Sequence, residues 1–238
     1  NMKSLFKTLT LLGFVLASSN TFSLQGLNVI TITTDDPQGY VKWLSDSQPI
    51  FQAAQGDSQA AQGICSPSSG GELPNEHYVW TISPSISAMM SNSDFFIEKD
   101  VATALRKIAK KREVIRRDSM YIIKESPISG VGETTAQYNL ISSTNDVNGY
   151  ADALSTMEKA AAENGFEDIK VALFGYLAGG DRALNVMASI QAPSSERLGA
   201  FFDQRQSSWM ADAVSEFNVI RTPILDFMME CTTLSVNN

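Results

Sequence analysis

The stretches "TTDDPQGY" at residues 33–40 and "STNDVNGY" at residues 143–150 decide how this sequence is interpreted. Each follows a run rich in β-branched residues and precedes a run with helical spacing of apolar residues, so each marks the passage from a strand into a helix. The identical positions are Thr34/Thr144, Asp36/Asp146, Gly39/Gly149 and Tyr40/Tyr150. Such a match is due to chance, to a repeated active-site loop or to a duplicated unit.

Two further pairs of segments repeat in the same order. Residues 68–85, "SSGGELPNEHYVWTISPS", match residues 177–194, "LAGGDRALNVMASIQAPS", in a Gly-Gly pair followed by an acidic residue and in a closing Pro-Ser. Residues 114–125, "VIRRDSMYIIKE", match residues 219–230, "VIRTPILDFMME", in Val-Ile-Arg and in the last Glu. Three collinear matches favour duplication of a whole unit.

The predicted units span residues 26–126 and 135–234, and residues 127–134 link them. In each unit the hydrophobic periodicity and the turn residues predict the order strand, helix, strand, strand, helix, strand. This order is that of the ferredoxin-like unit, so the predicted fold class is α+β. One such sheet leaves an apolar face without helices, and a second copy in the same chain can cover it.

The duplicated order resembles the dimeric α+β barrel superfamily, which includes antibiotic-biosynthesis monooxygenase-like, stress-responsive and muconolactone isomerase-like proteins. The resemblance covers nearly all of the chain after the N-terminal segment and rests on element order, not on a catalytic motif. It implies that the two tandem ferredoxin-like units pair their antiparallel sheets into a pseudo-dimeric barrel. The assembly expected from it is a monomer or a homodimer.

The same resemblance implies a disulfide between Cys65 and Cys231, the two cysteines of the chain. Cys65 is expected at the start of strand two of the first unit, and Cys231 just past the end of strand four of the second. In the barrel these two strands are antiparallel neighbours. The alternative is a pair of separate buried thiols.

Residues 1–23 have the order of a secretory signal peptide, with Lys3 and Lys7 before the apolar run at 9–17 and small residues after it. The alternatives are a buried N-terminal helix and a retained anchor. A cleaved signal predicts a periplasmic or secreted protein without stable membrane insertion, which is also a compartment that permits disulfides.

The formal net charge of −8 argues against nucleic acid as a partner. The one basic run, residues 106–117, is typical of the solvated face and last turn of a helix, and a phosphate-binding patch is the weaker interpretation. The ligand expected instead is a small apolar molecule or a carboxylate.

His77 is the only histidine, so neither a His-rich metal site nor a serine or cysteine triad is expected elsewhere in the chain. His77 itself could act as a base, or as an axial haem ligand as in some haem-binding relatives of the superfamily. The alternative is a solvated surface histidine. We expect no cofactor and no metal.

Three residues are catalytic candidates for polarising a carbonyl group: His77, Arg116 and Tyr121. Arg116 and Arg221 fall at matching places in the repeat and could hold a carboxylate, or pair with nearby acids instead. Asp36 and Asp146 could form a carboxylate pair, but Asp before a helix is more often a cap.

A ligand pocket is expected in the first unit, lined by Trp43, Trp80, Met89, Met90, Arg116 and Tyr121. The alternative is an ordinary aromatic core.

Three functions follow from these features. The first is a secreted or periplasmic small-molecule-binding protein of the dimeric α+β barrel type. The second, implied by the resemblance, is a cofactor-independent monooxygenase or isomerase acting on a small apolar or aromatic substrate. The third is a structural or interaction protein without catalysis.

Overall fold

The computed structural model describes residues 23–237, so the predicted signal peptide lies outside the described residues except for Ser23. The first half of the fold contains β1 (Gly26–Thr33), α1 (Pro37–Gln55), β2 (Ala61–Ser69), β3 (Glu76–Ser83), α2 (Ile86–Ser91), α3 (Lys99–Ile108) and β4 (Glu113–Lys124). The second half contains β5 (Thr134–Ser143), α4 (Val147–Glu163), β6 (Lys170–Ala178), β7 (Val186–Ala192), α5 (Ser195–Asp203), α6 (Ser208–Ser215), α7 (Phe217–Ile220) and β8 (Thr222–Val236). Both halves have the ferredoxin-like order that the repeat predicts.

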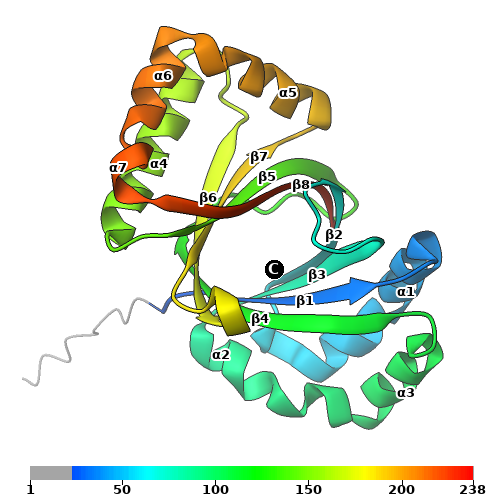
Figure 1. Ribbon diagram of the computed structural model, residues 1–238. Coiled ribbons are helices and arrows are strands. Elements are labelled where there is room, and N and C mark those ends of the chain that lie inside the picture. The colour runs from blue at the N-terminus through cyan, green and yellow to red at the C-terminus, as the bar shows by residue number, and fades with distance from the viewer. Residues whose placement is uncertain (1–22, 238) are drawn as a thin grey trace, which may run out of the picture.

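The strands form one closed antiparallel barrel in the order β1-β3-β2-β8-β5-β7-β6-β4. Helices α1 to α3 cover the outer side of the first unit and α4 to α7 that of the second, on opposite sides of the barrel (Figure 1). Closure leaves no free sheet edge between the units, because β2 pairs with β8 and β4 pairs with β6. The predicted α+β barrel of two tandem ferredoxin-like units is confirmed.

The seam between β2 and β8 carries the predicted disulfide. Cys65 and Cys231 are directly opposite in the antiparallel register, with a Cα–Cα distance of 4.0 Å, and they are bonded. Both lie in the middle of their strands rather than at strand ends, because β2 and β8 are each longer than expected. The bond is buried, and it joins the two units across 166 positions of sequence.

The repeated stretch is a helix cap and a packing device. The Asp36 and Asp146 carboxylates accept hydrogen bonds from the amides of Gly39 and Gly149 at 3.0 and 2.8 Å. A Cβ atom on either glycine would overlap the carboxylate, which accounts for glycine in both copies. The two aspartates therefore lie at separate helix starts and do not form a carboxylate pair.

The tyrosines that recur in the two units identify which arginines are equivalent. Tyr40 and Tyr150 are buried, and their hydroxyls accept hydrogen bonds from Arg112 at 2.7 Å and Arg221 at 2.5 Å. The expected equivalence of Arg116 and Arg221 is therefore wrong. The Val-Ile-Arg match is out of register, since a loop of different length precedes each fourth strand.

Three clusters of buried apolar side chains stabilise this arrangement. One lies under the helices of each unit, and the third fills part of the barrel interior with residues from both units. Among residues 23–237, no helix has the length and apolarity needed to cross a membrane.

Candidate functional site

The barrel encloses a cavity of about 340 Å³ that is lined by both units. Alternation along each strand sends every second side chain inward, so that Leu27, Val29, Trp80 and Ile82 reach the cavity from the first unit. Other residues of the same two strands, such as Ile30, Ile32 and Val79, pack under the helices instead. The cavity is therefore shared between the units, whereas the sequence placed a pocket in the first unit.

The two halves of the cavity wall differ in polarity at equivalent positions. In the first unit Val29 is paired with Trp80 and Leu27 with Ile82 across the β1–β3 ladder. At the corresponding places of the β5–β7 ladder, Asn139 is paired with Ser189 and Gln137 with Gln191. At these positions the first unit contributes apolar side chains and the second unit neutral polar ones. We call the first set the apolar wall (Leu27, Val29, Trp80 and Ile82) and the second set the polar wall (Gln137, Asn139, Ser189 and Gln191).

The polar wall is organised as a chain of hydrogen bonds. Ser126 donates to Gln191 at 2.9 Å, Gln191 to Ser189 at 3.4 Å, Ser189 to Gln137 at 3.3 Å, and Gln137 to Thr135 at 3.3 Å. Each of these side chains is neutral, so the wall offers hydrogen bonds without a net charge.

Asn139 lies beside this chain and is fully buried. Neither its Nδ2 nor its Oδ1 atom has a hydrogen-bond partner among the described residues. Buried polar groups in proteins are almost always paired, so this amide stands out in the cavity wall.

The apolar wall is shaped by a close approach of Trp80 to Gly63. These residues are opposite each other in the β2–β3 ladder, and a Cβ atom on Gly63 would overlap the indole ring and the carbonyl oxygen of Thr232. Glycine is required there because the indole ring and the Thr232 carbonyl group occupy the space that a Cβ atom would fill.

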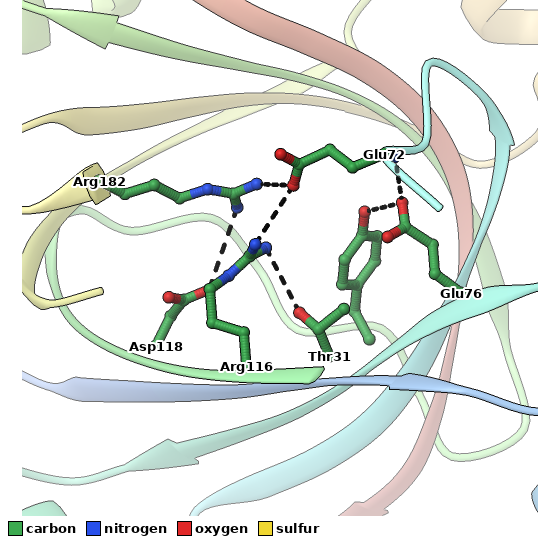
Figure 2. Close-up of polar contacts among 7 residues, drawn as sticks. Thr31, Glu72, Glu76, Arg116, Asp118 and Arg182 are labelled. Atoms are coloured by element: carbon green, nitrogen blue, oxygen red, sulfur yellow. Dashed lines mark hydrogen bonds and ion pairs between the residues drawn. The ribbon is translucent and has the colours of Figure 1, made fainter. Parts of the chain in front are cut away.

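One end of the barrel carries a charged network (Figure 2). Arg116 Nε donates to Asp118 Oδ2 at 2.9 Å, and Arg116 Nη1 lies 3.3 Å from Glu72 Oε2. Arg182 also binds Glu72, and its Nη1 atom lies 4.0 Å from Asp118 Oδ2. Because Glu72 and Arg182 come from the β2–β3 and β6–β7 connections, the network joins the two units at this end.

Asp118 is the carboxylate of this network that also lines the cavity. Its side chain is 3% exposed, and its Oδ1 atom lacks a partner among the described residues. Burial raises the pKa of Asp118 above the ordinary aspartate value, and the Arg116 guanidinium opposes part of this rise. The group is therefore a stronger base than an ordinary aspartate, held in place through its other oxygen.

A second buried carboxylate lies beside the charged network. Glu76 accepts hydrogen bonds from the Tyr78 hydroxyl at 2.6 Å and from the Glu72 amide at 2.8 Å. Burial and the neighbouring Glu76 raise the pKa of Tyr78, so its hydroxyl stays a neutral donor. These contacts hold the Glu72 loop against the barrel (Figure 2).

The predicted pocket residues are only partly brought together. Trp80 lines the cavity, and Arg116 lies at its charged end without lining it. Trp43 lies outside the barrel, where its indole donates to the carbonyl oxygen of Ala104 at 3.2 Å. Tyr121 alternates with the inward-facing Met120 and Ile122, so it also points outward.

The two predicted methionines also lie outside the cavity. Met89 is buried in α2 against Gly26, and Met90 is 66% exposed. The sequence does not show which face of the sheet α2 covers, so it could not place these two methionines relative to the cavity.

His77 is buried on the outer face of β3 and is not solvated as the alternative interpretation expected. Its Nδ1 atom lies 2.8 Å from Ser66 Oγ, and burial lowers its pKa. It alternates with the inward-facing Tyr78 and Trp80, so it does not face the cavity. The described residues therefore do not fit a haem held in the cavity by histidine.

Sequence reasoning missed Asp118, Arg182 and Asn139. A usable signal existed for Asn139, since an internal Asn in the apolar run "YNLIS" corresponds to Val29 in the first unit. Asp118 does pair with Arg116, as the ion-pair alternative for that arginine allowed, but its place in the cavity wall was not expected. For Arg182 no local signal existed, because its partner Glu72 comes from the other unit.

No family model matches the sequence, and a search of curated proteins finds no match. Solved structures do resemble the fold. A proposed monooxygenase from Fusobacterium nucleatum is 12% identical with a TM-score of 0.56, covering 91% of this chain and 95% of its own. One from Lactobacillus acidophilus is 8% identical with a TM-score of 0.56, covering 90% and 96%. An anthrone oxidase-like protein is 14% identical with a TM-score of 0.53, covering 90% and 92%. At these identities the likeness is one of fold.

Proposed function

We propose that the protein binds a small, largely apolar molecule in the barrel cavity and acts on it as a cofactor-independent monooxygenase or isomerase. The observation that carries this proposal is Asp118, a buried carboxylate in the cavity wall with a raised pKa and an unpaired oxygen among the described residues. Such a group fits the role of a general base. The solved structures of proposed monooxygenases with the same fold support the choice of reaction class.

In this proposal Asp118 removes a proton from an acidic C–H or O–H group of the substrate. The Arg182 guanidinium, which also lines the cavity, lies close enough to stabilise the oxygen on which negative charge develops. The apolar wall holds the remainder of the molecule and excludes water.

Two outcomes of the proton transfer define the two reaction types. In isomerisation the proton returns to a different carbon of the same molecule. In oxygenation of a CH2 group, the C–H electron pair forms a C–O bond to O2, and the resulting hydroperoxide loses water. One CH2 and one O2 then give one C=O and one H2O.

Oxygen uptake with anthrone as the probe substrate tests this proposal. Wild-type protein is expected to consume O2 in proportion to the anthraquinone formed. Asp118→Asn is expected to lower kcat by about 10²–10⁴-fold, the usual contribution of a general base, with little change in anthrone binding. Asp226→Asn is the control, because Asp226 lies on the outer face and accepts from the Tyr138 hydroxyl at 2.8 Å.

Binding without turnover is the second candidate function. It is favoured by the pairing of Asp118 Oδ2 with arginine and by the neutral chain of hydrogen bonds on the polar wall. Saturable binding of aromatic probes to a protein that neither consumes oxygen nor isomerises them would support this function over catalysis.

We further propose that the protein works outside the cytoplasm, in the periplasm or as a secreted protein. The buried Cys65–Cys231 bond supports this location, because structural disulfides persist in oxidising compartments. Protein isolated from its native compartment should react with a thiol reagent only after reduction. Two reactive thiols without reduction would contradict the proposal.

A further inference from the structure

We propose that Asn139 is the hydrogen-bonding anchor of the barrel cavity and that the ligand carries a donor and an acceptor side by side on a flat, otherwise apolar ring system. This inference rests on the proposed function only in that the cavity binds a small molecule. It adds the chemical class of that molecule and the residue that selects it.

The burial of Asn139 is unfavourable for the folded protein unless something occupies its polar atoms. The side chain is 0% exposed, and both polar atoms lack partners among the described residues. A buried amide left unpaired destabilises a fold, whereas an apolar residue of the same shape does not. The first unit has such an apolar residue, Val29, at the equivalent place.

The neighbours of Asn139 already use their own hydrogen-bonding groups elsewhere. Ser189, directly opposite in β7, donates to Gln137 and accepts from Gln191. The other cross-strand neighbour, Phe227 in β8, offers no polar group. Asn139 is one of the residues that line the cavity, and its amide keeps one donor and one acceptor unpaired among the described residues.

The opposite wall determines the remainder of the ligand. In the closed barrel β1 and β5 lie four strands apart in either direction, and so do β3 and β7. The Val29–Trp80 pair therefore faces the Asn139–Ser189 pair across the cavity. An aromatic ring system that stacks on the indole would present its polar edge to Asn139.

The absence of charged side chains beside Asn139 on the polar wall narrows the class of ligand further. Gln137 and Gln191 line the cavity beside Asn139, Ser189 is paired with Asn139 across the ladder, and none of these side chains carries a charge. A carboxylate at this wall would be buried without a cation, which is strongly unfavourable. The complementary group is neutral, such as a lactam, a primary amide or a hydroxy-ketone.

Three probes of nearly equal size test the class by isothermal titration: 2-quinolinone, N-methyl-2-quinolinone and naphthalene. The first has an N–H beside a carbonyl, the second has only the carbonyl, and the third has neither. Wild-type protein is expected to bind 2-quinolinone about tenfold or more tightly than the N-methyl compound, and naphthalene most weakly.

Asn139→Leu tests the residue. The variant is expected to bind the three probes with similar affinities, and its ligand-free form is expected to melt at a higher temperature than wild type. A purely structural asparagine would give the opposite shift in melting temperature. Val29→Ala is the matched control on the facing wall, and it should weaken all three probes alike while keeping their order.

The outcomes separate this inference from the proposed function. Binding of all three probes with equal affinity to wild type would overturn the anchor and leave the cavity as a binding site. Retention of the 2-quinolinone preference in Asn139→Leu would likewise assign the selection to another residue. If no probe bound to wild type at all, the cavity proposal would fall, and the anchor with it.

Discussion

Asn139 in β5 and Val29 in β1 occupy equivalent positions on facing walls of one barrel. The same relationship holds for Ser189 and Trp80 on the neighbouring strands. A duplicated fold thus encloses a cavity with two chemically different sides. A homodimer of one unit would have identical walls, so only a tandem chain can specialise each wall separately.

Reduction of the Cys65–Cys231 bond should destabilise the barrel. The bond closes a loop across 166 positions at the β2–β8 seam. By the loop-entropy argument its loss should lower the free energy of unfolding by about 3–5 kcal/mol. Urea titrations with and without reductant measure this difference.

The Cys65→Ser/Cys231→Ser double variant supplies the control for that experiment. Its unfolding midpoint should match that of the reduced protein and should not respond to reductant. A wild-type midpoint that is the same in both conditions would contradict a stabilising role for the bond.

Removal of Arg116 should move the pH dependence of turnover. Burial raises the pKa of Asp118, and Arg116 opposes this rise, so Arg116→Gln should raise the pKa further. Activity that requires the Asp118 carboxylate increases as pH rises through this pKa. The acidic limb of the kcat profile should therefore shift to higher pH in the variant.

The raised pKa of Asp118 also determines how its contribution to the free energy of unfolding changes with pH. A group that holds its proton more tightly in the folded state favours folding at low pH, and this contribution is lost as pH rises through the folded-state pKa.

Arg117→Gln is the matched control for the kcat profile of Arg116→Gln, because Arg117 lies outside the barrel over the Phe96 ring at 4.3 Å. An unshifted profile in Arg116→Gln would remove Asp118 from the proposed role.

Substitution of Gly63 should disturb the cavity without disturbing the helices. A Cβ atom at this position overlaps the Trp80 indole, so Gly63→Ala should displace the ring and weaken the binding of aromatic probes. Gly56→Ala is a suitable comparison for a glycine with open space around it, although its positive φ of 52° adds strain. The measurement is the quenching of Trp80 fluorescence by a bound ligand. Quenching that is the same in Gly63→Ala and in wild type would argue against the close contact between Gly63 and Trp80.

Loss of the hydroxyl of Tyr40 or Tyr150 should lower the stability of the fold but not ligand affinity. Tyr150→Phe removes the hydrogen bond from Arg221 on the outer side of the barrel. A bond to a charged group contributes about 1.5–3 kcal/mol, and the partial exposure of Arg221 places the expected loss near the lower limit. Tyr40→Phe should behave alike, since Arg112 makes the same contact. If either variant lost as much free energy of ligand binding as free energy of unfolding, the tyrosine would take part in binding, which would contradict the prediction.

The fold could be predicted because its signals are local and repeated. Asp36 and Asp146 act as the expected caps, and the strand patterns on either side of them give the element order. The pairing of Cys65 with Cys231 followed from the barrel resemblance, since the two strands that carry them are neighbours only in that fold.

The site could not be predicted to the same extent, because it depends on which face each side chain takes. Trp80 in β3 faces the cavity, whereas Trp43 in α1 packs outside the barrel. Arg116 was matched with Arg221 through a coincident tripeptide, whereas the contact with tyrosine identifies Arg112. The Asp118–Arg182 contact joins residues of different units and leaves no pattern in the sequence.

The central claim, that the barrel interior is the ligand site, is tested most directly by filling it. Ala172 in β6 lines the cavity and is 1% exposed, so Ala172→Phe places a ring in the space a ligand would occupy. Titration of 2-quinolinone should give saturable 1:1 binding to wild type and none to a variant that still unfolds cooperatively. Equal binding by the folded variant would contradict the claim and place the ligand elsewhere.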